Sequence, residues 1–217
     1  MMDIDKTRKA YNTYVEEQRN GYEKTARLIG YIIEEMKKAN IISSKVEVSG
    51  RIKGFESVYE NTKKGKEIED CFGIRIVGKE KDLEAIKKML NQMLIVQKEK
   101  DHRKKLDTLY NGVHVIAHMN GTHKQLIPVV EIQYWTEEVK EECMYGELAY
   151  IKYKNRNLKQ VQQNLYNSSR NEYKDMPIFY EIKGENVRML SKQETIYKMY
   201  PEIRKLEKPI KTYDSYR

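Results

Sequence analysis

The sequence has no apolar run approaching the roughly 18 residues that can span a bilayer, and its N-terminus lacks the apolar stretch of a signal peptide. It contains only 2 cysteines, which have neither metal-ligand spacing nor enough partners for a disulfide framework. These absences argue against a membrane protein, a disulfide-stapled secreted protein and a cysteine metal site. We therefore expect a cytoplasmic protein that does not act on a membrane.

The chain of 217 residues is long enough for one domain with an ordinary core. Charged residues make up 34% of it, and 41 Lys and Arg against 33 Asp and Glu give a net charge of +8. Such an excess favours anionic partners, namely phosphates, nucleotides or nucleic acid, without choosing among them.

Apolar periodicity predicts both helices and strands. Helices are expected over 4–39, with Asn20-Gly21 as a candidate break, over 82–94, over 137–154 and after the Ser191–Glu194 capping box. Strands are expected over 41–49, 72–77, from 94, and over 114–119 and 125–135. The order predicts an α+β fold, a mixed sheet of about five strands flanked by helices. We expect one domain, 1–217, with N-terminal helices in 1–40, a catalytic core in 41–154 and a helical or irregular extension in 155–217.

Four islands of polar residues lie at or beside the predicted strands. In the first, Arg51 and Lys53 are two apart, so an extended chain places them on one face, and Ser57 joins them if a helix starts here. Arg and Lys so placed can grip a polyphosphate. A solvated edge strand gives the same pattern.

The second island opens with Asp70, ahead of a strand that carries Gly73 and Arg75. A carboxylate at this place suits Mg²⁺, which prefers one or two carboxylates plus substrate phosphates. Gly73 would let a ligand or another backbone come close. The alternative is a structural salt bridge between Arg75 and Asp70 or Glu69.

The last two islands lie further along the chain. Tyr110 follows a basic loop and could stack on a base, and His114 opens the next strand. Glu131 and Gln133 fall on one face of an apolar strand, where a carboxylate costs energy unless a metal or cation pairs with it. Asp70 and Glu131 could share a divalent ion or act as ligand and general base.

In this order the four motifs are similar to those of one family. Arg51-x-Lys53-x-x-x-Ser57, Asp70-x-x-Gly73-x-Arg75, Tyr110-x-x-x-His114 and Glu131-x-Gln133 resemble the synthetase domain of RelA/SpoT homologues. The stretch ahead of the first motif is too short for the hydrolase domain of the larger members, so the resemblance implies a small, stand-alone synthetase. Such enzymes move the β,γ-pyrophosphate of ATP onto the ribose 3′-hydroxyl of GDP or GTP, making the alarmone (p)ppGpp.

The resemblance implies Mg²⁺ as cofactor and gives each motif a role. ATP phosphates would be bound by Arg51, Lys53 and Ser57, with Arg75 neutralising their charge. Asp70 would ligate Mg²⁺, and Glu131 would help to bind it or deprotonate the acceptor hydroxyl. The acceptor would be bound by Tyr110, stacked on its base, and by Lys104 and Lys105 of the basic loop, while Gln133 and His114 are supporting residues.

The sequence positions that would bind the acceptor depart from the family pattern. Leu106 and Thr108 stand where the family has Lys and Asn, Trp135 replaces an arginine, and Glu147-Leu148 is the nearest match to a Glu-His pair. One branch of the family consists of toxins that pyrophosphorylate the 3′ CCA end of tRNA and are paired with a small antitoxin protein, and another makes adenosine alarmones. A guanine nucleotide and tRNA therefore both stay open as acceptors, as do a homo-oligomer and a catalytically inactive binding module.

Overall fold

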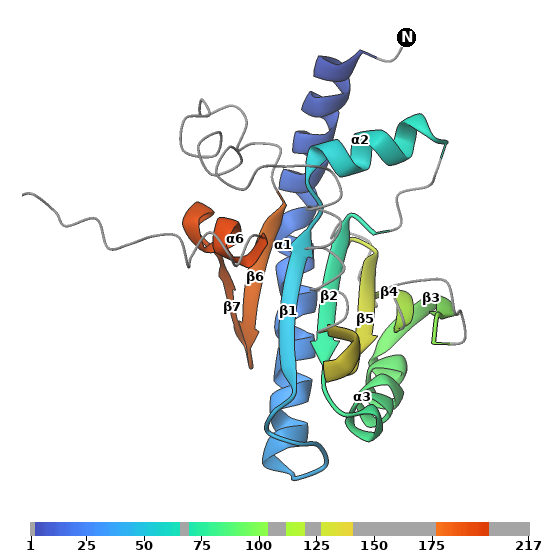
Figure 1. Ribbon diagram of the computed structural model, residues 1–217, viewed down its shortest axis with the longest axis vertical. Coiled ribbons are helices and arrows are strands. Elements are labelled where there is room, and N and C mark those ends of the chain that lie inside the picture. Colours follow the sequence, from blue (N-terminus) through green and yellow to red (C-terminus); the bar gives the residue numbers. More distant parts are fainter. Residues whose placement is uncertain (1–2, 66–69, 104–111, 120–126, 141–176, 200–217) are drawn as a thin grey trace, which may run out of the picture.

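The computed structural model describes residues 3–65, 70–103, 112–119, 127–140 and 177–199. They form a sheet with the strand order β3-β4-β5-β2-β1-β6-β7 (Figure 1). The strands are β1 (Glu47–Ile52), β2 (Phe72–Val77), β3 (Leu94–Asp101), β4 (Val113–Met119), β5 (Val130–Trp135), β6 (Ile178–Lys183) and β7 (Asn186–Met189). In the described residues, helices α1 (Ile4–Lys38), α2 (Phe55–Lys63), α3 (Glu80–Met93) and α6 (Lys192–Met199) flank the sheet. No helix in these ranges is both long and apolar enough to cross a membrane.

The α+β prediction is confirmed, and the sheet has 7 strands where the sequence predicted about five. The two further strands, β6 and β7, lie in the part expected to be helical or irregular. Only Tyr180 and Ile182 of β6 are buried, and the other residues of both strands are exposed or half-buried, so the apolar pattern is weak. The sheet is mixed because β2 and β5 are parallel, whereas the other neighbouring strands are antiparallel.

Helix α1 is continuous, so the candidate break at Asn20-Gly21 is wrong. The side chain of Asp3 caps its start by accepting hydrogen bonds from the backbone N–H groups of residues 5 and 6. Tyr22, Ala26 and Ile29 lie fully buried on one face of it. This continuous burial outweighs the roughly 1 kcal/mol that a glycine costs inside a helix.

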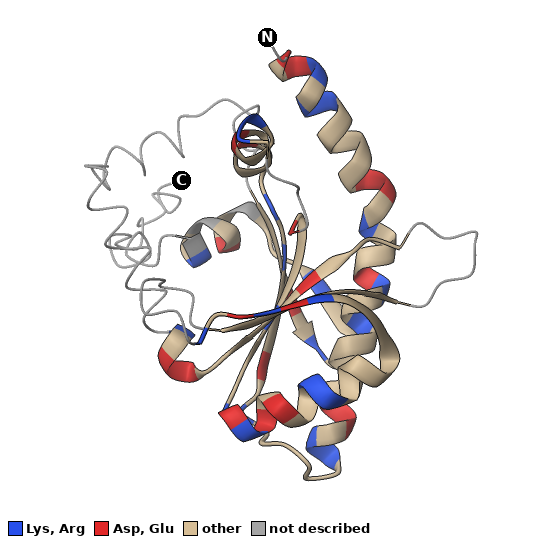
Figure 2. Ribbon diagram, turned by 90° about the vertical axis from the view of Figure 1, so that its right-hand side faces the viewer, with Lys and Arg blue, Asp and Glu red and all other residues tan. Residues whose placement is uncertain are grey.

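One face of the sheet carries the core. Apolar residues of α1 and α3 form a single cluster with the strand residues that point toward them, including Ile74, Ile132 and Tyr180. Gly30 of α1 lies so close to the β6–β7 turn that a Cβ there would be 2.1 Å from the carbonyl oxygen of Gly184. Helix α6 lies on the opposite side of the sheet (Figure 2). By the strand register, that side also carries polar residues of the central strands, such as Arg51 and Glu131.

Several element boundaries differ from the sequence prediction. Strand β1 begins six residues later than expected, at Glu47. Strand β3 continues from Leu94 to Asp101, and seven of its eight residues are exposed. The predicted strand 72–77 is confirmed, as is the capping box, in which Ser191 and Glu194 exchange bonds of 3.2 and 2.8 Å.

Candidate active site

The predicted site residues of three strands lie on one face of the sheet, the polar face. Arg51 is opposite Gly73, and Gly73 is opposite Glu131 in the next strand. Residues directly opposite in neighbouring strands point the same way. One row across β1, β2 and β5 therefore reads Arg51, Gly73, Glu131, and the next row contains Arg75 and Gln133.

Gly73 leaves an open place in the first of these rows. A Cβ at Gly73 would meet nothing closer than two backbone oxygens at 3.8 Å, so a side chain could fit there. It would fill the space between Arg51 and Glu131. The missing side chain thus leaves room for a ligand between a guanidinium and a carboxylate.

Glu131 is buried, and both of its carboxylate oxygens form hydrogen bonds. The Nδ1 of His114 lies 3.0 Å from Oε1, and the Nε2 of Gln133 donates to Oε2 at 2.7 Å. Because an ionised carboxylate only accepts, Nδ1 of His114 carries the proton in this bond. Burial alone would raise the pKa of Glu131, but these hydrogen bonds and the charge of Arg51 hold it below its ordinary value.

Arg75 extends this polar chain toward Trp135. Its Nε donates to Oε1 of Gln133 at 3.1 Å, and its guanidinium carbon lies 3.6 Å from the centre of the Trp135 ring. Stacking on an indole fixes the plane of a guanidinium. Arg75, Gln133, Glu131 and His114 thus form a continuous line of contacts across β2, β5 and β4.

Lys53 and Asp70 meet at the end of β1. The Nζ of Lys53 is 2.5 Å from Oδ2 of Asp70, and the backbone of Lys53 accepts a hydrogen bond from the hydroxyl of Tyr11 in α1. Ser57 is exposed in the first turn of α2, which starts two residues after Lys53. The free N–H groups and positive dipole end of a helix N-terminus favour an anion at this place.

The carboxylate of Asp70 is a donor of the kind that Mg²⁺ takes. Among the described residues no three His, Cys, Asp or Glu side chains are grouped to hold a metal by themselves. Asp70 is 31% exposed, and its carboxylate has acceptor capacity beyond the bond to Lys53. This donor chemistry fits a hard cation that takes one or two carboxylates and completes its shell with substrate phosphates and water.

Tyr110, Lys104 and Lys105 lie outside the described residues, and so do Leu106, Thr108 and the Glu147-Leu148 pair. The ends of the segment 104–111 are described. The backbone N–H of His102 donates to the carbonyl of Gly112 at 3.0 Å, which brings the two ends together. Binding of the acceptor by Tyr110, Lys104 and Lys105 therefore stays a prediction. The two ends of the segment that carries these residues lie beside β4.

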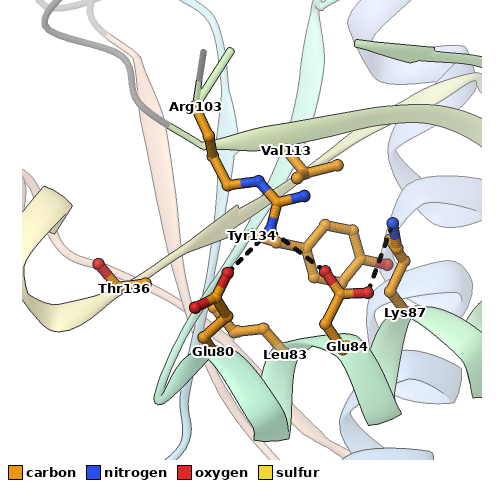
Figure 3. A pocket seen from close by; sticks show the side chains of 8 residues that line it. All are labelled: Glu80, Leu83, Glu84, Lys87, Arg103, Val113, Tyr134 and Thr136. Atoms are coloured by element: carbon orange, nitrogen blue, oxygen red, sulfur yellow. Dashed lines mark hydrogen bonds and ion pairs between the residues drawn. The ribbon is translucent and has the colours of Figure 1, made fainter. Parts of the chain in front are cut away.

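A small hollow between α3 and β5 lies apart from the polar face (Figure 3). Arg103 enters it and binds Glu80 at 3.1 Å and Glu84 at 3.3 Å, while also forming an ion pair with Asp101 at 2.8 Å. Three carboxylates already surround this guanidinium, so the hollow does not offer it to an anionic substrate. Its contacts anchor the chain just before Lys104.

Two contacts of the site were missed by sequence reasoning. The hydroxyl of Tyr22 in α1 donates a hydrogen bond to the carbonyl of Gly73 at 2.9 Å. Its helical spacing with Ala26 and Ile29 could have marked it as a core residue, but no sequence signal gives its partner. Trp135 was noted only as a departure from the family pattern, whereas it forms the stacking surface for Arg75.

With this geometry in place, comparisons with known proteins decide the family. The model of the region found in RelA / SpoT proteins matches residues 34–158, more than half of the chain. The chain belongs to the RelA/SpoT family. The resemblance of the four motifs is thereby confirmed, and the match spans every motif residue from Arg51 to Gln133. No curated protein matches the chain.

Solved structures of RelA/SpoT relatives share the fold. Small alarmone synthetase 1 from Bacillus subtilis bound to its product pppGpp matches with a TM-score of 0.55 at 20% identity, over 65% of this chain and 82% of that one. The same synthetase bound to AMPCPP gives 0.50 at 16%, over 91% and 97%. A GTP pyrophosphokinase family protein from Streptococcus pneumoniae gives 0.52 at 16%, over 92% and 98%.

The lowered pKa of Glu131 predicts a pH-dependent contribution to stability. The folded state holds the carboxylate more strongly ionised than the unfolded chain does. Its contribution is therefore complete above the ordinary pKa of 4.5 and disappears as the pH falls through the lower, folded-state value. We expect wild type to exceed Glu131→Gln in free energy of unfolding by about 2 kcal/mol at pH 7. Urea titrations across the acid range should show this advantage shrinking, and a constant advantage would contradict the assignment.

Proposed function

We propose that this protein is a cytoplasmic pyrophosphokinase that transfers the β,γ-pyrophosphate of ATP to the ribose 3′-hydroxyl of GDP or GTP. The observation that carries the proposal is the row Arg51, Gly73 and Glu131, which sets a cation, an open place and a buried carboxylate side by side. The relatives whose structures contain pppGpp and AMPCPP support nucleotides as the substrates.

The donor half of the site would hold the triphosphate of ATP. Arg51 and Lys53 supply cations, and Ser57 lies in the first turn of α2, where backbone N–H groups are free. Arg75, fixed by Trp135, neutralises further phosphate charge. Asp70 would hold Mg²⁺, which when bound offsets the charge that develops on the phosphate oxygens. Holding the phosphates in one geometry is itself a large part of catalysis for phosphoryl-type transfers.

Glu131 would take the proton of the acceptor hydroxyl. Its low pKa keeps it ionised at neutral pH, and each oxygen that accepts one bond from His114 or Gln133 retains a second lone-pair site. The O–H bond of the ribose breaks as the proton moves to Glu131. The ribose oxygen forms a bond to the β-phosphorus, the bond from that phosphorus to the bridging oxygen breaks, and AMP leaves.

The test is a transfer assay with γ-³²P-labelled ATP, Mg²⁺ and purified protein. Parallel reactions contain GDP, GTP, AMP or deacylated tRNA. Label on a guanine nucleotide is the expected result. Label on AMP or on tRNA only would refute the guanine acceptor but keep the pyrophosphokinase, and transfer to none of them by the folded protein would refute the enzyme.

The tRNA 3′ end is the second candidate acceptor. The observation that favours it is Trp135, which is buried under Arg75 in a position where the family has an arginine. An indole there cannot contact acceptor phosphates as an arginine would. The net charge of +8 is in keeping with an RNA partner, because Lys and Arg contacts supply much of such affinity.

Tyr110→Ala tests the acceptor side of the proposal. Loss of the stacking ring should raise the acceptor KM about tenfold or more, since base stacking is worth about 1–3 kcal/mol. AMPCPP binding should change less than twofold. Steady-state kinetics with varied acceptor and calorimetry with AMPCPP give the two values. An equal loss on both sides would place Tyr110 elsewhere, and Tyr110→Phe should retain most of the acceptor affinity.

A further inference from the structure

Helix α6 is fixed on the polar face by polar contacts at its start. Ser191 and Glu194 form the capping box, and Arg188 of β7 binds Glu194 at 3.0 Å and Glu181 of β6 at 2.9 Å. The helix lies on the side of the sheet away from α1 (Figure 2). The β6–β7 hairpin therefore holds the start of α6 in place.

This placement brings Lys198 onto Phe179, the residue of β6 that lies opposite Arg51. The Nζ of Lys198 lies 5.0 Å from the centre of the Phe179 ring. Phe179 is directly opposite Arg51 in the register of β6 and β1, so both side chains point to the polar face. Lys198 lies outside the region matched by the family model, because that region ends at residue 158.

The surroundings of Lys198 disfavour its own charge. Lys198 is an exposed residue of α6. Protein atoms near its ammonium lower its pKa, and the charges of Arg75 and Lys140 lower it further. Glu181 and Glu47 act in the opposite direction but do not outweigh these effects. The basic groups that act on Lys198 thus belong to β2 and to the segment 137–140.

The two neighbouring carboxylates are already engaged. Glu181 is bound by two basic side chains of the β6–β7 hairpin at 2.7 and 2.9 Å, and Glu47 is bound by Lys140 at 2.6 Å. In the described part of the chain no carboxylate forms an ion pair with Lys198. An anionic ligand would relieve the repulsion between Lys198 and Arg75, and a polyphosphate can bridge several cations at once.

We propose that Lys198 is a phosphate-binding residue of the donor site, which α6 delivers next to Arg51 and Arg75 to contact the β- or γ-phosphate of ATP. The inference rests on the proposed function, because it assumes that the polar face holds ATP. It gives the C-terminal part of the chain a role in substrate binding.

Binding of AMPCPP and of AMP, measured by calorimetry, tests this proposal. Lys198→Ala should weaken AMPCPP binding about tenfold, the loss of one charge-assisted hydrogen bond. It should change AMP binding less than twofold, because AMP lacks the β- and γ-phosphates. Lys198→Arg should retain most of the AMPCPP affinity. Lys88→Ala, an exposed lysine of α3 on the other side of the sheet, is the control for net charge and should bind as wild type does.

The outcomes separate this inference from the proposed function. If wild type binds AMPCPP and Lys198→Ala binds it equally well, Lys198 is not a phosphate ligand and the proposed function stands. Equal weakening of AMP and AMPCPP would show a structural role and also overturn the inference. If folded wild type binds no AMPCPP, the ATP site itself is refuted together with the role of Lys198.

Discussion

Glu131→Gln should fold and bind AMPCPP, yet transfer pyrophosphate at least about 100-fold more slowly than wild type. The substitution removes the carboxylate that would accept the proton of the acceptor hydroxyl. It also places an amide NH₂ against one of two donors, the Nδ1 of His114 or the Nε2 of Gln133. The loss should therefore appear in kcat, with the KM for ATP little changed, in assays with labelled ATP.

Two further variants make this result interpretable. Glu99→Gln removes one negative charge at an exposed position of β3, where the carboxylate binds Lys87, and should keep activity within about twofold. Asp70→Asn should lose activity as severely as Glu131→Gln, because it weakens the ligand proposed for Mg²⁺ and the partner of Lys53. Full activity in either acidic-site variant would overturn its assigned role.

Gly50→Ala should destabilise the fold by about 3 kcal/mol or more, a large effect for one methyl group. A Cβ at Gly50 would be 2.1 Å from the hydroxyl oxygen of Tyr22 and 3.2 Å from the Cβ of Tyr180. Tyr22 is fully buried, and its hydroxyl is held by the carbonyl of Gly73. The ring cannot move aside without losing that bond, so the backbone of β1 has to shift. Urea unfolding of wild type and variant gives the difference.

A double-mutant cycle locates the clash. Tyr22→Phe alone should cost about 1–2 kcal/mol, since it leaves the carbonyl of Gly73 without this donor. In the Tyr22→Phe background the closest ring atom to the new methyl group is Cζ at 3.3 Å, so Gly50→Ala should cost clearly less than in wild type. The same cost in both backgrounds would show that the hydroxyl is not the obstacle.

The sequence predicted those elements whose burial alternates or repeats regularly. Strand β2 was predicted with its correct bounds because it is apolar at nearly every position. Helix α3 was predicted to within two residues at each end because its buried residues recur at helical spacing. Strands β6 and β7 gave no comparable signal. Few of their residues are buried. Strand β6 forms by pairing with β1, a partner more than one hundred residues earlier in the chain, and β7 forms by pairing with β6.

The site was predictable as a set of residues but not as a set of contacts. Two-residue spacing correctly placed Glu131 and Gln133 on one face. Spacing within one strand cannot show that Lys53 binds Asp70, or that Trp135 stacks on Arg75, because these pairs depend on how separate elements are packed. Lys198 lies beyond every motif, so only the position of α6 connects it with the site.

The pairing of β1 with β6 also has a consequence for the order in which the protein forms during translation. Residues up to β5 leave the ribosome well before β6 and β7 exist. Until then β1 has an unpaired edge, and the part of α1 around Gly30 has no hairpin to pack against. Such edges are templates for aggregation. We expect nascent chains that stall before residue 178 to need a chaperone, although the polar residues of the site have already been synthesised.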